Sequence, residues 1–388
     1  MRARDLADRV FQVGPDYRLI PRGKLTAADR LRLGVDTSAA DFDGILVPSS
    51  ASLPVKAIAA DTAALLRTLQ RPGPLPHRAR ELARANARAL QRLVLDSVLA
   101  VQDGDRFVTG PAAGRVLGLV AHLAPARTRL ARLSRAALAY VEALPIASAA
   151  ALSDRLYFYD RAPPSPAWAA RLRTSDDVVR FLGAGEACGA LLASEWTAVK
   201  DQAISTDWLV WHARRRPRAT APYKLYINVA AADLPEAFAV TLTEATAGGV
   251  VAVKVGSNLH GLLRPDKFVL YLRRRQDVRS VGGRIARALR GARIHGTPFT
   301  AAVDADGLVS WGMDPPARTP ARPLTPSWRR SITDRLAVAL LAARSIDPGN
   351  RALTPVQFAL QRLHLDGVDP GTWAPVESEW EGLAGARR

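Results

Sequence analysis

Three short runs in the second half of the chain alternate aliphatic residues with lysine and tyrosine. They are YKLYINV (Tyr223–Val229), VVAVKV (Val250–Val255) and KFVLYL (Lys267–Leu272). Successive side chains of a β-strand point to opposite faces, so such strands would pair into a sheet with one apolar and one polar face. The residues expected on the polar face are Lys224, Tyr226, Asn228, Lys254, Lys267 and Tyr271. A face lined by ammonium and phenol groups suits an anionic ligand.

The same alternation has a simpler interpretation. Antiparallel sheets often keep one face in water, and lysines on that face then only solvate it. Lysine is, however, scarce in a chain that strongly prefers arginine. Arginine stays charged, whereas burial and cationic neighbours can make a lysine neutral enough to act as a base. Both interpretations place Val251, Val253 and Val255 of the second run in the core, opposite Lys254.

The chain is long enough for two regions. Its 388 residues are 48% hydrophobic, which is enough to bury a sizeable core. We expect a helical N-terminal region over residues 1–148 and an α+β domain over residues 149–388, because the pattern changes between Pro145 and Pro166. The second region would contain a mixed or antiparallel sheet flanked by helices, so the predicted fold class is α+β.

Amphipathic periodicity predicts the helices, and Asp-Gly pairs predict two hairpins. The hairpins turn at Asp103-Gly104 and Asp306-Gly307. The predicted helices cover residues 57–70, 78–101, 127–144, 175–182 with Ser175 as its cap, 234–245, 277–290, 327–345 and 354–365. A further strand is predicted over Trp208–Ala213, followed by an exposed break over Arg214–Pro217.

The charge balance favours an anionic partner. Lys and Arg total 54 against 36 Asp and Glu, a formal charge of +18, and such a field attracts phosphorylated molecules. RNA binding would also need exposed aromatic residues among the basic ones, and this pattern is not present, so nucleic acid is not an expected partner.

The single cysteine, Cys188, excludes an internal disulfide and a multi-cysteine metal site. We expect it to be a small buried apolar residue.

Several kinds of segment and motif are absent. Residues 1–13 carry charges throughout instead of the apolar core of a signal peptide, and no apolar run is long enough to cross a bilayer. We therefore expect a cytoplasmic protein without a membrane partner.

Nucleotide-binding, kinase, zinc-protease and serine-hydrolase signatures are missing, and the six histidines are scattered. These absences predict no cofactor and no metal, and leave lysine, arginine, tyrosine and carboxylates as catalytic candidates.

Five segments together resemble the HopA-type effector family. They are RLYFYDRAP (Arg155–Pro163), YKLYINV, RPDKFVLYL (Arg264–Leu272), GTPFTAAVDADGLVSWGMDPP (Gly296–Pro316) and SWRR (Ser327–Arg330). The resemblance covers roughly Leu152 to Pro375. In class V lanthipeptide and thioamitide pathways, members of this family remove phosphate from phosphoserine or phosphothreonine and leave dehydroalanine or dehydrobutyrine. The resemblance implies the same elimination on a phosphorylated precursor peptide with a leader, downstream of a separate Ser/Thr kinase.

The order of several residues is also similar to that in bacterial phosphothreonine lyases. This second resemblance implies that Lys254 is the base, that Arg264 lies near the position of the phosphate-binding arginine, and that Arg329, after Trp328, is the terminal arginine. It likewise aligns Lys224 with the first lysine strand and Leu270-Tyr271 with a Leu-Tyr pair. Tyr226 stands where those lyases have a histidine taken to be the general acid, so the resemblance leaves the proton donor open.

Chemistry gives these residues roles without the family. Phosphate elimination needs a base for the Cα proton, cations around the phosphate and a donor for the bridging oxygen. We assign the base to Lys254, because like-charged neighbours and desolvation would lower its pKa. The residues expected to contact phosphate are Arg264, Arg329 and Lys267, and those expected to donate a proton are Lys224, Tyr226 and Tyr271.

Each assignment has a structural alternative. Arg264 and Lys267 could simply pair with Asp266, the strand tyrosines could pack with satisfied hydroxyls, and Asp314 could fix a loop. The leading hypothesis is a phosphopeptide lyase whose helical first region docks a kinase or a peptide leader. The alternative is a non-catalytic effector-type module that binds a phosphorylated or acidic protein.

Overall fold

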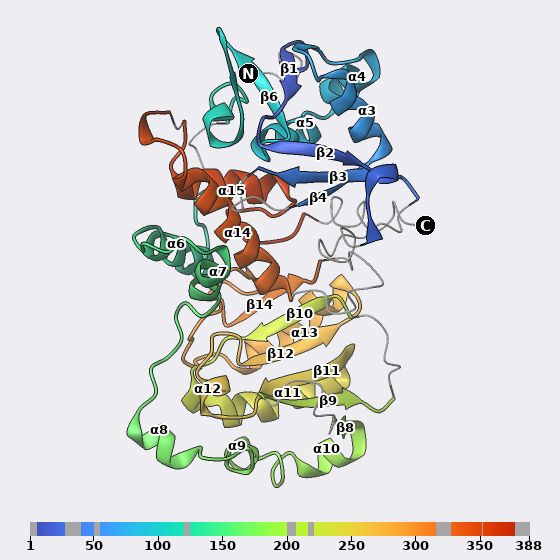
Figure 1. Cartoon of the computed structure of the whole chain (residues 1–388). Coiled ribbons are helices and arrows are strands. Elements are labelled where there is room, and N and C mark those ends of the chain that lie inside the picture. Colours follow the sequence, from blue (N-terminus) through green and yellow to red (C-terminus); the bar gives the residue numbers. More distant parts are fainter. Residues whose placement is uncertain are drawn as a thin grey trace.

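The computed structural model describes residues 6–27, 40–49, 55–119, 125–199, 207–215, 221–315, 327–350 and 352–376. It confirms the α+β class, with helices packed on antiparallel sheets (Figure 1). Within these ranges, no helix combines the length and apolar character needed to cross a membrane. Of the predicted exposed break, Arg216 and Pro217 lie outside the described residues.

The largest sheet has seven strands, and every pairing in it is antiparallel. The three lysine-bearing runs form its adjacent strands β10, β12 and β11, as the alternation predicted. From edge to edge the strands are β13 (Ala301–Ala302), β14 (Val309–Met313), β10 (Tyr223–Ile227), β12 (Phe268–Leu272), β11 (Val250–Gly256), β9 (Trp208–Ala213) and β8 (Trp196–Ala198).

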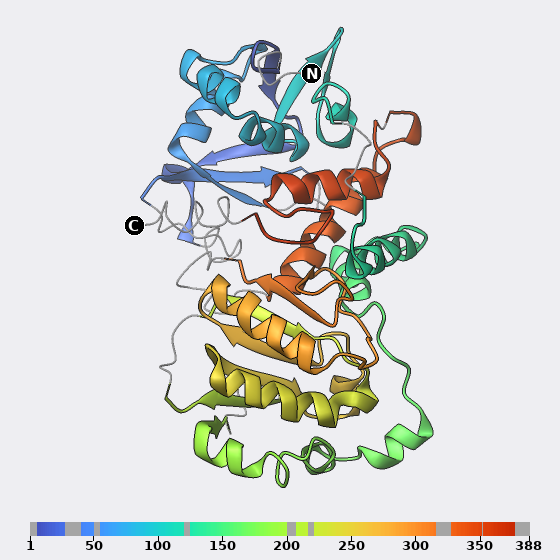
Figure 2. The same cartoon turned by 180° about the vertical axis from the view of Figure 1, so that it is seen from behind.

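Two helices, α11 (Leu234–Ala247) and α13 (Arg275–Ala288), cover one face of this sheet (Figure 2). Their apolar sides share a core with the aliphatic residues of the strands, including Leu225, Leu270 and Val253. The opposite face of the sheet therefore carries the polar side chains. Further helices in this part of the chain are α8 (Pro166–Arg171), α9 (Ser175–Phe181), α10 (Gly189–Glu195) and α12 (Leu259–Leu262).

A register shift corrects the predicted facing of β11. Val250 pairs with Leu272, whereas Ala252 pairs with Tyr271, so an extra residue is accommodated between them. Such a bulge inverts the alternation on one side of it. Val250 rather than Val251 therefore belongs to the core cluster, while the alternation holds from Ala252 onward and leaves Lys254 on the polar face.

The first region contains more β-structure than predicted. Its strands form a four-stranded sheet, β5-β1-β6-β7, and a three-stranded sheet, β2-β3-β4. They are β1 (Val10–Val13), β2 (Tyr17–Pro21), β3 (Phe42–Pro48), β4 (Lys56–Ala59), β5 (Gly73–Pro74), β6 (Leu99–Asp103) and β7 (Arg106–Val108), and the helices are α3 (Ala60–Thr68), α4 (His77–Ala85), α5 (Arg88–Leu95) and α6 (Arg129–Glu142). The hairpin at Asp103-Gly104 is confirmed as the β6–β7 connection.

The predicted helix over residues 78–101 was wrong in extent. It breaks at Asn86, whose extended backbone ends α4 and whose side chain accepts a hydrogen bond from the Arg88 backbone. Asparagine competes with helical hydrogen bonds in this way. The final part is the buried strand β6. The cap of α9 is also corrected, because Thr174 rather than Ser175 forms a capping box with Asp177.

The C-terminal helices α14 (Trp328–Arg344) and α15 (Pro355–Leu365) share one core with the first region. Residues of this core include Leu90, Val94, Leu138, Leu336, Leu340 and Leu360. A helix missed by the sequence analysis, α7 (Ala149–Tyr157), begins in the predicted boundary, capped by Ser148, and packs on α14. The division into residues 1–148 and 149–388 stays a prediction.

Candidate functional site

The polar face of the seven-stranded sheet brings the predicted lysines and tyrosines together in two rows. Tyr226 on β10 and Lys254 on β11 both lie opposite Val269 of the intervening strand β12. Lys224 lies opposite Tyr271 in the adjacent row. Strands are spaced by about 4.8 Å, so the backbones of Tyr226 and Lys254 are about 10 Å apart, a gap that their side chains can close.

Lys254 is the accessible amine of this face. Its side chain is half-buried, and its Nζ atom lies 4.1 Å from the centroid of the Trp208 ring. Among the described residues, its ammonium makes no recorded hydrogen bond or ion pair. Burial, followed by the charges of Lys224 and Arg264, lowers the pKa of Lys254 from 10.5 to about 8. A substantial fraction of this amine is therefore neutral near pH 8 and able to accept a proton.

Lys224 is held as a fixed cation at the edge of the same face. Its side chain is buried, and Nζ lies 2.7 Å from a carboxylate oxygen of Asp314. The ammonium also lies 5.1 Å from the centroid of the Tyr271 ring. Asp314 in turn accepts a hydrogen bond of 2.7 Å from the backbone N–H of Trp328, at the start of α14. The position of Lys224 is thus determined by a loop and a helix from the C-terminal part of the chain.

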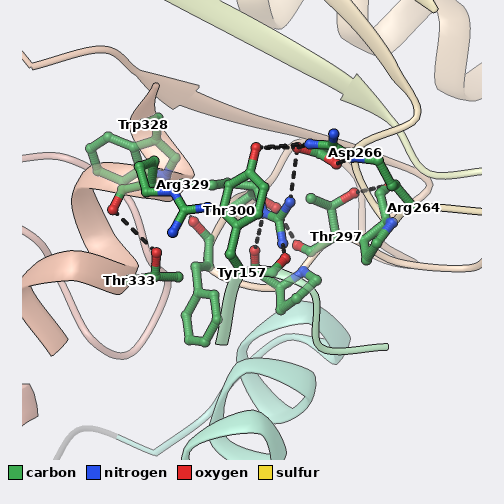
Figure 3. A network of polar contacts seen from close by, with 12 residues as sticks. Tyr157, Arg264, Asp266, Thr297, Thr300, Trp328, Arg329 and Thr333 are labelled. Carbon is green, nitrogen blue, oxygen red and sulfur yellow. Dashed lines mark hydrogen bonds and ion pairs between the residues drawn. The ribbon is translucent and has the colours of Figure 1, made fainter. Parts of the chain in front are cut away.

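Arg264 is oriented by Asp266 and Tyr157 (Figure 3). Its Nε and Nη2 atoms donate to the two carboxylate oxygens of Asp266, at 2.9 and 3.1 Å, and Nη2 also donates to the Tyr157 hydroxyl at 3.0 Å. Tyr157 itself donates to Asp266 at 2.8 Å. A guanidinium has five N–H donors, so the two on Nη1 remain, and no described residue is recorded as accepting from them. The side chain is 13% exposed, so Nη1 can serve an incoming anion.

Asp266 is a buried anion between two arginines. Burial alone would raise the pKa of its carboxyl, but the charges of Arg329 and Arg264, with hydrogen bonds from Arg264 and Tyr157, hold the pKa well below its usual range. Arg329 Nη1 lies 3.0 Å from the carboxylate. Because the negative charge persists at every working pH, Asp266 keeps both guanidinium groups in place.

The structure does not support the direct phosphate contact that we predicted for Arg329. Its side chain is only 1% exposed. Nε donates to the Pro298 carbonyl, Nη2 to the Tyr157 carbonyl, and Nη1 pairs with Asp266. Nε and Nη2 are thus hydrogen-bonded inside the protein, and the buried Nη1 is held by an ion pair without a hydrogen bond. Arg329 holds Asp266 and the last residue of α7 in place, and it affects the polar face only through the electrostatic field of its positive charge.

Lys267 also departs from the predicted role. It is fully buried, donates to the Val229 carbonyl at 3.0 Å, and lies 2.9 Å from Nδ1 of His295. Burial lowers the pKa of Lys267 to about 7, and burial followed by the charge of Lys267 lowers the pKa of His295 to about 4. A phosphate cannot reach this ammonium in the described conformation. The pair ties the start of β12 to the loop that follows α13.

The two strand tyrosines, Tyr226 and Tyr271, are both buried phenols with raised pKa values. Burial raises the pKa of Tyr226 well above its ordinary value and also raises the pKa of Tyr271, with Asp314 adding to both effects. Both phenols are therefore protonated at neutral pH and can donate but not act as bases. No described residue is recorded as a hydrogen-bond partner of the Tyr226 hydroxyl.

Three site residues were missed or undervalued by the sequence analysis. Tyr157 lies in the quoted RLYFYDRAP segment, but its helix was not predicted, so its approach to Asp266 was not foreseen. Trp208 lies on the correctly predicted strand β9, where alternation could have placed it on the face of Lys254. Asp314 was assigned only to a loop, although it is the counterion of Lys224.

No protein-family model and no curated protein matches the chain. Similar solved structures include effector proteins from Pseudomonas syringae. The effector from pv. syringae strain 61 has a TM-score of 0.41 and 14% identity, and the match covers 64% of this chain and 99% of the effector. The effector from pv. tomato strain DC3000 has a TM-score of 0.43 and 14% identity, and the match covers 64% of this chain and 98% of the effector. The type III effector and phosphothreonine lyase OspF from Shigella flexneri has a TM-score of 0.26 and 14% identity, covering 47% and 88%. Similarity at these levels carries no conclusion about fold or activity.

Proposed function

We propose that the protein is a phosphoserine or phosphothreonine lyase that eliminates phosphate from a phosphorylated precursor peptide. The product would be dehydroalanine or dehydrobutyrine in a lanthipeptide-like modification pathway. The observation that carries the proposal is the setting of Lys254: an accessible amine with a pKa of about 8, beside the fixed cations Lys224 and Arg264. This combination supplies a base and an anion site within one polar face.

The elimination proceeds by removal of one proton and loss of one phosphate. Neutral Lys254 takes the Cα proton, the electrons of the C–H bond form the Cα–Cβ double bond, and the bond between Cβ and the bridging oxygen breaks. The departing phosphate keeps the bridging oxygen, which receives a proton from a neighbouring donor. Lys224, Tyr226 and Tyr271 are the donors on this face, and the buried phenols are protonated at the operating pH.

Arg264 would receive the phosphate through Nη1, while its other nitrogens stay on Asp266 and Tyr157. A guanidinium held in this manner loses little freedom when it binds, which favours a defined phosphate position. The bound dianion raises the pKa of Lys254, opposing the effect of the neighbouring cations. Desolvation, the largest cause of the lowered pKa, persists when substrate covers the face, so the amine retains a neutral fraction.

The remaining parts of the proposal concern partners. Residues 1–148 would dock the leader of the precursor peptide or the separate kinase that phosphorylates it. The kinase follows from the reaction, because an enzyme that removes phosphate from serine or threonine requires a prior phosphoryl transfer. No kinase signature occurs in this chain.

The test is elimination in vitro. The purified full-length protein is incubated with a precursor peptide carrying phosphoserine or phosphothreonine, and mass spectrometry measures loss of phosphoric acid. We expect loss with the wild type and with Arg279→Ala, which removes an exposed basic residue of α13 on the helix-covered side of the sheet. We expect at least a 100-fold slower loss with Lys254→Ala. Tight binding without elimination by the wild type would refute the lyase and favour the phosphoprotein-binding module. Undiminished elimination by Lys254→Ala would refute the assignment of the base.

A further inference from the structure

One indole ring contacts both accessible cations of the site. The centroid of the Trp208 ring lies 4.1 Å from Nζ of Lys254 and 4.8 Å from Cζ of Arg264. Both distances are within the range of cation–π attraction. The ring also accounts for the only contact that is recorded for the Lys254 ammonium among the described residues.

The strand register explains why the ring can reach both groups. Trp208 begins β9 and lies opposite Gly256, while Lys254 lies opposite Val210, so Trp208 and Lys254 share the polar face. Gly256 carries no side chain, and the backbone of Gly261 packs closely against it. Arg264 lies in the segment that precedes β12 and reaches the same ring while two of its nitrogens donate hydrogen bonds to Asp266.

We propose that Trp208 is a positioning residue, which shields the Lys254 amine from water and holds it apart from the guanidinium of Arg264. The catalytic meaning of this inference rests on the proposed function. A flat ring in contact with two cations fixes their separation without neutralising either one. A carboxylate in the same place would fix them equally well, but it would keep the amine protonated.

The ring acts on the Lys254 proton in two opposite ways. Cation–π attraction favours the ammonium form, whereas exclusion of water disfavours it. Burial is the largest cause of the lowered pKa of Lys254, so removing the ring has the net effect of hydrating the amine and raising that pKa. The other charged or titratable groups on this face are Lys224, Tyr226, Tyr271, Arg264, Asp266, Asp314 and His212, and a substitution of Trp208 alone removes none of them.

The experiment compares Trp208→Ala and Trp208→Phe with Trp168→Phe, which alters a tryptophan that packs against Phe181 and Arg171 outside the site. Competitive acylation of lysines over a range of pH, followed by peptide mass spectrometry, gives the pKa of Lys254 without requiring turnover. We expect Trp208→Ala to raise this pKa by about one, which lowers the neutral fraction at pH 7 about tenfold. Trp208→Phe should give a smaller rise, and Trp168→Phe none.

Turnover provides the second readout. The pH profile of kcat/KM on a phosphorylated precursor peptide should move to higher pH by the same amount in Trp208→Ala, while KM changes less than kcat. An unchanged pKa of Lys254 in folded Trp208→Ala would overturn the proposal. Circular dichroism checks folding, and if the alanine variant does not fold, Trp208→Phe and Trp208→Leu replace it with the same criterion. A shifted pKa in a protein that eliminates no phosphate would refute the proposed function and leave the shielding role intact.

Discussion

Replacing Lys254 by methionine tests the electrostatics of the site through stability alone. Methionine keeps an unbranched side chain of similar length beside Trp208 and removes the charge. Folding lowers the pKa of Lys254 from 10.5 to about 8. A lysine with a lower pKa in the folded state destabilises that state wherever both forms are protonated, which is below about pH 8. This penalty disappears as the pH rises from about 8 to 10.5.

The size of the effect follows from the two pKa values. A tenfold change in proton affinity corresponds to about 1.4 kcal/mol, so the difference between 10.5 and about 8 gives an upper value of about 3 kcal/mol. Partial exposure of the side chain reduces this to about 1–3 kcal/mol. At about 2 °C per kcal/mol, Lys254→Met should raise Tm at pH 7 by about 2–6 °C relative to the wild type.

The assay is thermal unfolding of both proteins at several pH values between 6.5 and 10.5, with Lys24→Met as the control for losing an exposed lysine. We expect the Tm advantage of Lys254→Met to be constant up to about pH 8 and then to shrink. A variant that is less stable than the wild type at pH 7, or an advantage that does not change with pH, would refute the reasoning. Either result would mean that the ammonium of Lys254 does not carry the penalty implied by its lowered pKa.

Three further outcomes follow from the same geometry. As Lys254 loses its proton, the rate of elimination at low substrate concentration should rise about tenfold per pH unit below pH 7 and level off near pH 8. A rate that falls over this pH range in stopped assays would contradict a neutral amine base. Asp266→Asn leaves Arg264 and Arg329 without their shared counterion, so it should lower the free energy of unfolding by about 3–5 kcal/mol in urea titrations. A decrease of less than about 1 kcal/mol would argue against that pairing. Tyr157→Phe removes one hydrogen bond to Arg264, so it should lower the free energy of unfolding by only about 1 kcal/mol. The same change should weaken binding of a phosphorylated peptide several-fold in calorimetry. Unchanged affinity would show that Asp266 alone orients Arg264.

Local alternation was sufficient to predict the sheet and its polar face. Lys224, Tyr226, Lys254 and Tyr271 share that face as expected, because period-two patterning survives wherever the strand is regular. It failed at the bulge before Ala252, where one extra residue shifts the register. Nothing in a single sequence marks the position of such a bulge.

Long-range contacts explain the remaining differences. Lys267 precedes its strand, and its ammonium is captured by Val229 and His295 rather than by the site. Arg329 follows a tryptophan as expected for a phosphate ligand, yet a carboxylate and two backbone carbonyls occupy its nitrogens. These partners come from segments far apart in the chain, so composition and spacing gave no indication of them. Tyr157 was missed for the same reason.

The first turn of α14 has a consequence for anyone who wishes to cut or recombine this chain. The Trp328 backbone N–H holds Asp314, and the next residue, Arg329, holds Asp266, while the later turns of the same helix lie in the core built by the first region. A fragment ending before residue 327 would lose both carboxylate anchors at once. A chimera with a foreign first region would keep them only if its grafted core accepted the apolar side of α14. Under the proposed function, in which the first region docks the peptide, peptide specificity and chemistry would therefore be exchanged together rather than separately.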